Sequence, residues 1–161
     1  MDKITITLWF DGVAEQAAAF YVGLFPNSRI DAIHRSPADN PSTEKGAVLV
    51  VEFTLDGRAF TALNGGPHFK FTEAVSLVID CVDQAEVDRY WQALIADGGS
   101  PSQCGWCKDR FGLSWQVTPR RLKELLAQPD RAAAERAMQA MMQMAKIDIS
   151  KLEAASNGDQ S

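Results

Sequence analysis

A chain of 161 residues with 46% hydrophobic and 23% charged residues has the composition of one globular domain. Its net charge of −5 argues against a broad nucleic-acid surface, which needs clustered Lys and Arg, and its three cysteines favour a reduced protein over a disulfide framework. The sequence shows no signal-peptide pattern and no apolar run long enough to span a bilayer. We therefore expect a cytoplasmic protein without nucleic-acid or membrane partners.

The first half of the chain predicts a strand, a helix and three further strands. Residues 4–10 alternate apolar and polar side chains, as half-buried strands do. An alanine-rich segment with apolar positions at helical spacing predicts a helix over 13–25, which Pro26 ends. Strands are expected at 28–36, 47–55 and 58–64, with a polar loop over 37–46 and a tight Asp56-Gly57 hairpin turn before the last strand.

The second half repeats this order and continues into helices. The patterns predict a strand over 74–81, a helix over 83–99 that begins at an acidic residue and ends at a glycine pair, an irregular hairpin over 101–112 and a strand over 113–118. Helical spacing predicts further helices over 120–127, 131–146 and 149–156. Ser150 and Glu153 are spaced as a capping box for the last helix.

The two halves align with each other, which indicates an internal duplication. Ile4–Phe10 matches Val75–Cys81 at one offset, and at a second offset Gly57, Phe60 and Thr61 match Gly112, Trp115 and Gln116. The fold class that follows is α+β, with two tandem βαβββ modules at about 1–66 and 72–119 and C-terminal helices over 120–156. Because neither copy could bury a stable core alone, we expect residues 1–161 to pack as a single domain.

One face of the predicted strands is polar in three separate segments. Side chains alternate between the two faces of a strand, so this face carries Thr5, Thr7 and Trp9 in the first strand, Ser76 and Asp80 in its repeat, and Ser114, Gln116 and Thr118 in the closing strand. Curved sheets would bring these groups into one concavity with an aromatic wall, which is the composition of a small-molecule site. The alternative is that this face is simply solvated.

Several segments resemble one known family. The duplicated module, with "AAAFY" in its first helix and "DRFGLSWQVTP" at its close, resembles the glyoxalase/bleomycin-resistance/extradiol-dioxygenase (vicinal oxygen chelate) superfamily. Within it, the segments 8–21, 63–71, 87–91, 104–119 and 139–155 are similar to the PhnB-like branch, which is often labelled 3-demethylubiquinone-9 3-methyltransferase. The resemblance implies a curved sheet around a cavity and a homodimer that completes the site.

Metal-using members of that superfamily place His or Glu in the first and last strands of each module. Matched by position, this chain offers Thr5, Thr61, Ser76 and Gln116. Hydroxyls and a neutral amide lack the charge and softness with which imidazole and carboxylate bind first-row metals. We therefore expect no metal at this position and no ordinary glyoxalase or dioxygenase activity.

The methyltransferase label finds no support among the residues. Methyl transfer needs bound S-adenosylmethionine, whose common fold has a glycine-rich turn between a strand and a helix. Here "LNGGP" follows a hairpin strand and leads into proline. We expect no cofactor.

His68 and Glu52 are candidate catalytic residues. His68 lies in the "GGPHFKF" segment, where the glycines allow close backbone approach, and it could act as an acid or base near neutral pH; the alternative is a linker or dimer-contact residue. Glu52 lies in an apolar strand, where burial would raise its pKa and make it a usable base, although a solvated position is slightly favoured. We expect Asp80 to help the turn into the following helix.

The "CGWC" pair and the C-terminal methionines favour structural roles. Cys104 and Cys107 lack the second cysteine pair of a zinc ribbon and the helix N-terminus of a thioredoxin-like site, so we expect structural cysteines around a packed Trp106. The methionines at helical spacing favour core or dimer packing; these are Met138, Met141, Met142 and Met144.

The sequence thus predicts a homodimeric, cytoplasmic small-molecule protein, either a metal-independent enzyme or a binder. Its ligand is expected to contact Thr5, Thr7, Trp9, Thr61, Ser76 and Gln116, with His68 as a further candidate. Two alternatives remain open: a drug-sequestering binder of the bleomycin-resistance kind, and the quinone methyltransferase that the label implies.

Overall fold

The computed structural model describes residues 3–159. The chain forms two compact units, Met1–Phe71 and Thr72–Ser161. Each unit contains one four-stranded sheet, and the C-terminal helices belong to the second unit.

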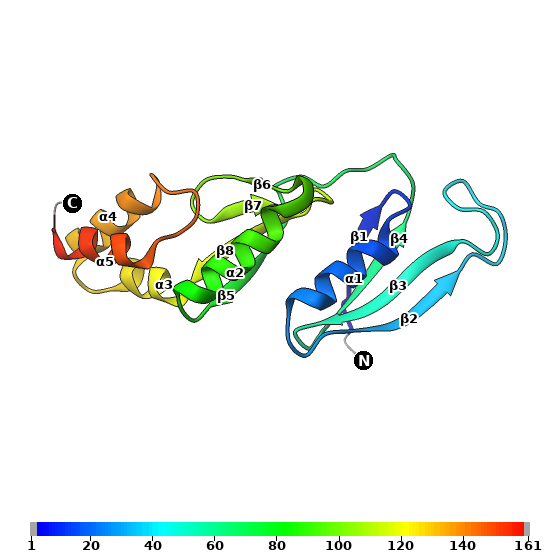
Figure 1. The fold of residues 1–161 in the computed structure, drawn as a ribbon, viewed down its shortest axis with the longest axis horizontal. Helices are drawn as coiled ribbons and strands as arrows, with labels where there is room; N and C mark the ends of the chain where they lie inside the picture. The colour runs from blue at the N-terminus through cyan, green and yellow to red at the C-terminus, as the bar shows by residue number, and fades with distance from the viewer. Residues whose placement is uncertain (1–2, 160–161) are drawn as a thin grey trace. The chain divides into compact units, whose positions relative to one another are not determined.

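The first unit is a mixed sheet with a helix against one face. Its elements are β1 (Ile6–Phe10), α1 (Ala14–Leu24), β2 (Arg29–Arg35), β3 (Val48–Leu55) and β4 (Arg58–Asn64). The strand order is β1-β4-β3-β2, where β1 runs parallel to β4 and the other pairs are antiparallel. Figure 1 shows α1 lying against this sheet, roughly along the direction of β3.

Aromatic stacking fills the space between α1 and its sheet. The rings of Tyr21 and Phe53 stack with centroids 6.4 Å apart, and Phe53 stacks on Phe60 at 5.5 Å. Ala17 and Ala18 are fully buried, because small side chains let the helix approach the strands closely. Burial of these side chains, at about 25 cal/mol per Å² of apolar surface, is the main stabilisation of the unit.

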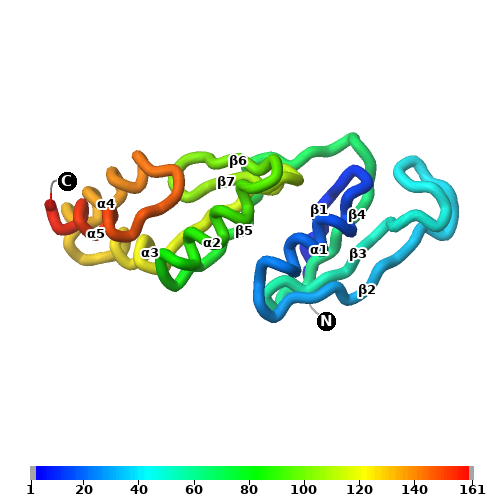
Figure 2. Tube along the Cα trace, in the orientation of Figure 1, coloured from blue at the N-terminus to red at the C-terminus, as the bar shows by residue number. Residues whose placement is uncertain are grey.

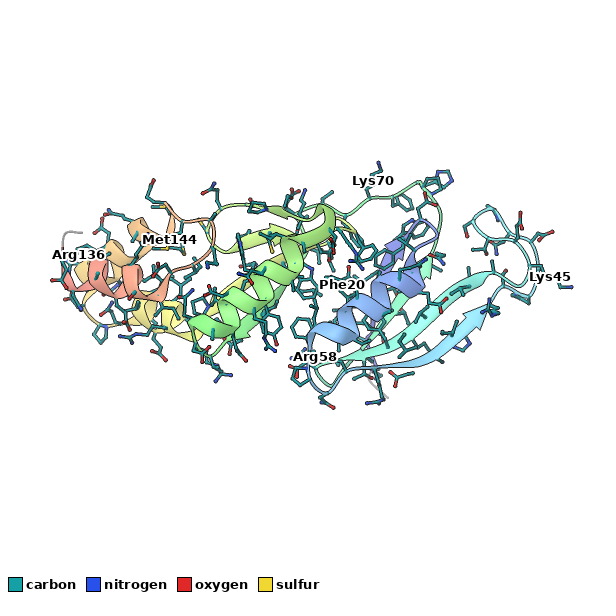
Figure 3. All side chains as sticks on the ribbon, viewed as in Figure 1. Phe20, Lys45, Arg58, Lys70, Arg136 and Met144 are labelled. Carbon is teal, nitrogen blue, oxygen red and sulfur yellow. The ribbon has the colours of Figure 1, made fainter. Side chains whose placement is uncertain are left out.

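Two connections of the first unit differ in length. Asp56 and Gly57, with φ of 46° and 78°, form the tight turn between β3 and β4 that the sequence predicts. The loop over 36–47 extends past the ends of β2 and β3 and carries Lys45 (Figures 2 and 3). Hydrogen bonds between Ser36 and residues 46 and 47 close the base of this loop.

The second unit repeats the topology of the first, which confirms the internal duplication. Its elements are β5 (Ser76–Cys81), α2 (Gln84–Ile95), the short 3₁₀ turn η1 (Ala96–Gly98), β6 (Ser100–Pro101), β7 (Trp106–Lys108) and β8 (Ser114–Pro119). The strand order β5-β8-β7-β6 corresponds position for position to β1-β4-β3-β2, with β5 parallel to β8. Asp83 caps α2 by accepting a hydrogen bond from the Glu86 amide at 2.9 Å.

A buried carboxylate shapes the turn between β7 and β8. Asp109 accepts hydrogen bonds from the backbone amides of Phe111 and Leu113 and from the indole Nε1 of Trp115, at 2.8, 3.1 and 2.8 Å. Three donors compensate the desolvation of a charged group that is 2% exposed. Asp109 thereby ties the turn to the largest fully buried side chain of the sheet, Trp115.

The three C-terminal helices pack on each other and on the second sheet. They are α3 (Arg120–Ala127), α4 (Arg131–Met141) and α5 (Ile149–Asn157). Their core consists of Leu122, Leu125, Ala137, Ile147 and Leu152. Arg136 of α4, labelled in Figure 3, donates to the carbonyl oxygens of Ala155 and Ser156 and so satisfies the end of α5.

Two local predictions in this region were wrong. The helix expected over 131–146 ends at Met141, because the chain turns there to bring residues 144 and 145 against the 104–105 loop. The residue that caps α5 is Asp148, whose side chain accepts from the Lys151 amide. Ser150 lies inside the first turn of α5, so the capping box with Glu153 is absent, and Glu153 instead pairs with Arg121 at 2.7 Å.

Candidate functional site

The sheet face opposite α1 carries a polar row that crosses all four strands. We call this face, and the corresponding face of the second sheet, the open face. Thr7 of β1 lies opposite Thr61 of β4 and their hydroxyl oxygens are 2.6 Å apart. On the next strand Glu52 lies opposite Thr61, and its carboxylate is 3.0 Å from Nε2 of His34. Hydroxyls, a carboxylate and an imidazole therefore share one face.

The His34–Glu52 pair is half-exposed. The exposed fractions of the two side chains are 55% and 50%, so the solvated position favoured for Glu52 fits better than deep burial. Sequence reasoning missed His34, because the strand pattern over 28–36 is irregular. The pairing between β2 and β3 shifts register between Ile30 and Ala32 and again between His34 and Arg35, which a strict alternation of faces cannot anticipate.

The "GGP" segment folds back over Trp9. The indole Nε1 of Trp9 donates to the carbonyl oxygen of Gly66 at 2.9 Å, and its ring meets Phe69 edge-on with centroids 4.9 Å apart. A Cβ atom added to Gly65 would lie 2.3 Å from the Trp9 ring, so this position has room only for hydrogen. The segment therefore covers the indole of Trp9.

Thr5 and His68 are the remaining candidates of the first unit. His68 is exposed, and no hydrogen bond or ion pair joins it to another described residue. Thr5 is exposed and precedes the first residue of β1. Their roles in ligand binding stay predictions.

The open face of the second sheet holds the equivalent positions. Gln116 of β8, the counterpart of Thr61, donates its amide to the hydroxyl of Ser76 at 2.9 Å. Val78 and Trp106 flank Gln116 on the neighbouring strands, where Thr7 and Glu52 flank Thr61 in the first unit. The second face is therefore more apolar and aromatic than the first.

A cavity of about 570 Å³ opens beside β6, β7 and β8. Its walls are formed by Glu73, Ser100, Pro101, Ser102, Gln103, Cys104, Trp106, Cys107, Lys108 and Ser114. Lys108 pairs with Glu73 at this wall, and that ion pair lowers the pKa of the Glu73 carboxyl. Ser114 is 1% exposed, and its hydroxyl has no hydrogen-bond partner among the described residues. Sequence reasoning placed Ser114 on the polar face but gave it no role.

The cysteines take structural positions. Burial raises the pKa of the Cys107 thiol to about 12, so it stays protonated at neutral pH. Cys81 is fully buried and its pKa is raised to about 12 for the same reason. Cys104 is partly exposed in the hairpin loop with φ of 58°. Residues 104–107 do not form a helix N-terminus, which is the structure that would stabilise a thiolate.

Asp80 does not help the turn into α2, contrary to the expectation. Its carboxylate instead accepts from Arg120 Nε and Lys123 Nζ, both at 2.6 Å. These hydrogen bonds, first that of Lys123, hold the pKa of Asp80 below its usual range. The position at the end of β5 thus anchors α3 to the second sheet.

The residues at the superfamily's metal positions do not fit a metal ion. Thr61, Ser76 and Gln116 present hydroxyl and amide groups, which are poor ligands for first-row metals. Within residues 3–159, no three His, Cys, Asp or Glu side chains gather in a group that could hold a metal ion. We derive no metal-assisted step for this site.

Comparisons with known proteins agree with the fold and extend over both modules. A family model described as 3-demethylubiquinone-9 3-methyltransferase matches residues 2–118. A PhnB protein from Bacillus cereus with the same label is 34% identical, and the match covers 73% of this chain and 99% of that protein with a TM-score of 0.66. Among curated protein sequences, none matches the chain.

More distant structures share the fold alone. Protein PA1353 from Pseudomonas aeruginosa is 22% identical, with 74% of this chain and 98% of that chain covered and a TM-score of 0.59. The fosfomycin resistance protein FosX from Listeria monocytogenes is 18% identical, with 79% and 98% covered and a TM-score of 0.53. The two βαβββ sheets and these likenesses define a protein of the glyoxalase-like fold class.

The chain belongs to the PhnB-like family, whose model is described as 3-demethylubiquinone-9 3-methyltransferase. The model's match ends at residue 118, so helices α3, α4 and α5 lie outside it. None of the helices in the described part of the chain is both long and apolar enough to cross a membrane.

Proposed function

We propose that this protein binds a small organic molecule on the open faces of its sheets without a metal ion. The observation that carries the proposal is the pair of polar contacts at equivalent strand positions, Thr7–Thr61 in one unit and Ser76–Gln116 in the other. Partly exposed polar side chains that already bond to each other are preorganised for a ligand. Thr5, Trp9 and His68 are the further ligand contacts that we assign to the first unit.

A metal-independent reaction is the second candidate. The His34–Glu52 pair favours it, because a carboxylate that bonds one imidazole nitrogen fixes the tautomer and leaves the other nitrogen for proton transfer. In this candidate His34 is the acid or base, and Glu52 orients it. The methyltransferase label gains no such support from a described side chain.

Thermal-shift measurements with S-adenosylmethionine, a soluble quinone and bleomycin test the binding proposal. The quinone or bleomycin is expected to raise the melting temperature, and Gln116→Ala or Thr61→Ala to reduce that rise. The matched control is Gln92→Ala, which removes an exposed glutamine from α2 and should leave the rise unchanged. If both open-face variants, Gln116→Ala and Thr61→Ala, respond like the unsubstituted protein to every compound, the assignment of the open faces is wrong.

We also propose that the protein is a cytoplasmic homodimer. Support comes from the exposed apolar side chains of the described residues, among them Val75 and Val78 at 64% and 53% exposure. Sedimentation equilibrium should return twice the chain mass of 17.7 kDa. A mass of one chain across the concentration range would contradict this.

A further inference from the structure

The hydroxyl of Ser114 is the structural feature that the proposed contacts leave unexplained. It is buried in the wall of the 570 Å³ cavity and lacks a hydrogen-bond partner among residues 3–159. Buried polar groups are almost always paired, because leaving one unpaired costs free energy. Two other buried serines of this chain follow that rule: Ser36 donates to Ala38, and Ser156 accepts from Gln128. An orphan hydroxyl beside a cavity therefore calls for a partner from outside the chain.

The strands around Ser114 place two different neighbours beside it. Lys108 lies directly opposite on β7, and Ser76 directly opposite on β5. The ammonium group of Lys108 is already paired with Glu73, and the Ser76 hydroxyl accepts from Gln116. Neither neighbour supplies an uncompensated charge, so the polar end of the cavity is neutral overall.

An aromatic wall lies next to this polar end. Trp106 is half-buried, and on β7 its side chain projects to the same side as Lys108, two residues away. An indole face offers stacking to a flat ring, and such contacts add about 0.5–1.5 kcal/mol beyond area burial. A flat surface and one directional hydrogen-bonding group are complementary to a planar ring that bears one oxygen.

We propose that this cavity binds a neutral, planar aromatic molecule whose hydroxyl or carbonyl oxygen hydrogen-bonds to Ser114 while its ring stacks on Trp106. The inference rests on the proposed function and names the class of molecule that one part of the site takes. A carboxylate or phosphate would be a weaker ligand, because it would have to displace Glu73 from Lys108 to gain a counter-charge.

The C-terminal extension supports the wall of this cavity. The backbone amides of Cys104 and Gly105 donate to the carbonyl oxygens of Met144 and Ala145, both at 2.8 Å, and fix the loop that contributes Cys104. A Cβ atom at Gly105 would lie 3.1 Å from Ile147 Cγ1. The loop is therefore held against the segment between α4 and α5, which fixes this part of the cavity wall before any ligand binds.

Phenol and toluene are the probes that test the proposal, because they share a ring and differ in the oxygen. Titration of the ¹⁵N-labelled full chain, followed by NMR, should shift the Trp106 indole signal and the amide signals of residues 100 and 102–108. Phenol should bind more tightly than toluene. Ser114→Ala should weaken phenol binding about 3- to 10-fold and leave toluene binding unchanged, which corresponds to the loss of one neutral hydrogen bond.

Two further variants make the result specific. Trp106→Ala should weaken both probes, because it removes the stacking surface. Ser156→Ala, which removes a buried but paired serine far from the cavity wall in sequence, should change neither. The proposal is overturned if neither probe shifts signals of residues 100–108, or if the preference for phenol survives Ser114→Ala.

Gln116→Ala separates this inference from the proposed function. If it abolishes the thermal response to a larger ligand while Ser114→Ala leaves the phenol preference intact, the open face binds a ligand but the Ser114 assignment is wrong. If Ser114→Ala removes the phenol preference while Gln116→Ala and Thr61→Ala change no ligand response, the cavity is a site of its own and the open-face proposal fails.

Discussion

At the scale of single residues, the candidate site depends on polar and small side chains at a few positions. Only glycine fits at position 65, because the indole of Trp9 occupies the volume that any side chain would need. Ser114 differs, because its buried hydroxyl has no hydrogen-bond partner among the described residues although the residue contributes to a cavity wall. Substitution at either position should change the free energy of unfolding, and unfolding measurements can separate this effect from ligand binding.

Gly65→Ala should destabilise the protein by roughly 1–3 kcal/mol, because the new methyl group would overlap the Trp9 ring and force it or the "GGP" segment to move. Urea unfolding, together with the chemical shift of the Trp9 indole, measures both effects. Gly23→Ala is the matched control: no atom lies within 4 Å of the added Cβ in α1, so it should stabilise by about 0.5–1 kcal/mol. Equal effects of the two substitutions would contradict the packing described for Gly65.

Ser114→Ala should raise the free energy of unfolding by roughly 1–3 kcal/mol in the absence of ligand, because it removes an unpaired buried hydroxyl. Ser156→Ala should lower it by about 1 kcal/mol, because that hydroxyl accepts a hydrogen bond from Gln128. Thermal and urea unfolding measure both. A loss of stability in Ser114→Ala would show that the hydroxyl is paired in solution and would remove the basis for the cavity proposal.

At the scale of elements, the sequence predicted nearly every helix and strand because each has a strong period and a clear stop. The Asp56-Gly57 turn and the strand–helix–strand order of both modules depend on such local signals, and both are confirmed. The wrong prediction for Asp80 involves partners distant in sequence. Asp80 pairs with Arg120 and Lys123, which lie about forty residues further on, so no local pattern could assign it to α3.

The candidate site was only partly predictable for the same reason. Strand alternation placed Thr7, Ser76 and Gln116 on faces opposite the helices, and the hydrogen bonds of these side chains lie on those faces. It could not foresee the His34–Glu52 contact, which depends on shifts in strand register, or the missing partner of Ser114, which depends on the three-dimensional surroundings of one atom.

Asp80→Asn should reduce the acid sensitivity of the link between α3 and the second sheet. The folded-state pKa of Asp80 is depressed, so the ion pairs contribute fully above the unfolded-state pKa of about 3.9 and are lost as the pH falls through the lower folded-state value. The carboxylate is 42% exposed, so the contribution should stay below about 1 kcal/mol. Unfolding free energies between pH 7 and pH 2 measure it. Asp11→Asn, at an exposed position, is the control; an identical pH profile for both variants would refute the prediction.

Ile147→Ala should destabilise the C-terminal helices by about 2–5 kcal/mol, because the side chain is fully buried among Leu122, Leu125 and Leu152. The amide signals of Cys104 and Gly105 should also shift, since their hydrogen-bond acceptors lie in the adjoining segment. Met142→Ala, at a position 48% exposed, should cost far less. Unchanged signals at the 104–105 loop would show that the extension does not support the cavity wall.

At the scale of the whole molecule, the duplication gives two sheets that each have a helix on one face and an open face on the other. Each open face carries a pair of polar side chains that bond to each other, and the second also carries the exposed Val78. A face that only meets water would not require these groups. A sheet covered on one side only buries little surface for its length, and small domains are marginally stable for that reason.

We therefore predict that the two units unfold in a single transition, as one domain. The indole N–H groups of Trp9 and Trp115 are suitable reporters, because each is hydrogen-bonded within its own unit, to Gly66 and Asp109 respectively. Their NMR signals, followed through a urea titration, should disappear with the same midpoint and slope. Gly65→Ala in the first unit should then shift the midpoint of the Trp115 signal as much as that of Trp9. Separate midpoints, or a shift confined to Trp9, would mean that the units are independent domains and that a ligand bound in one stabilises only that one.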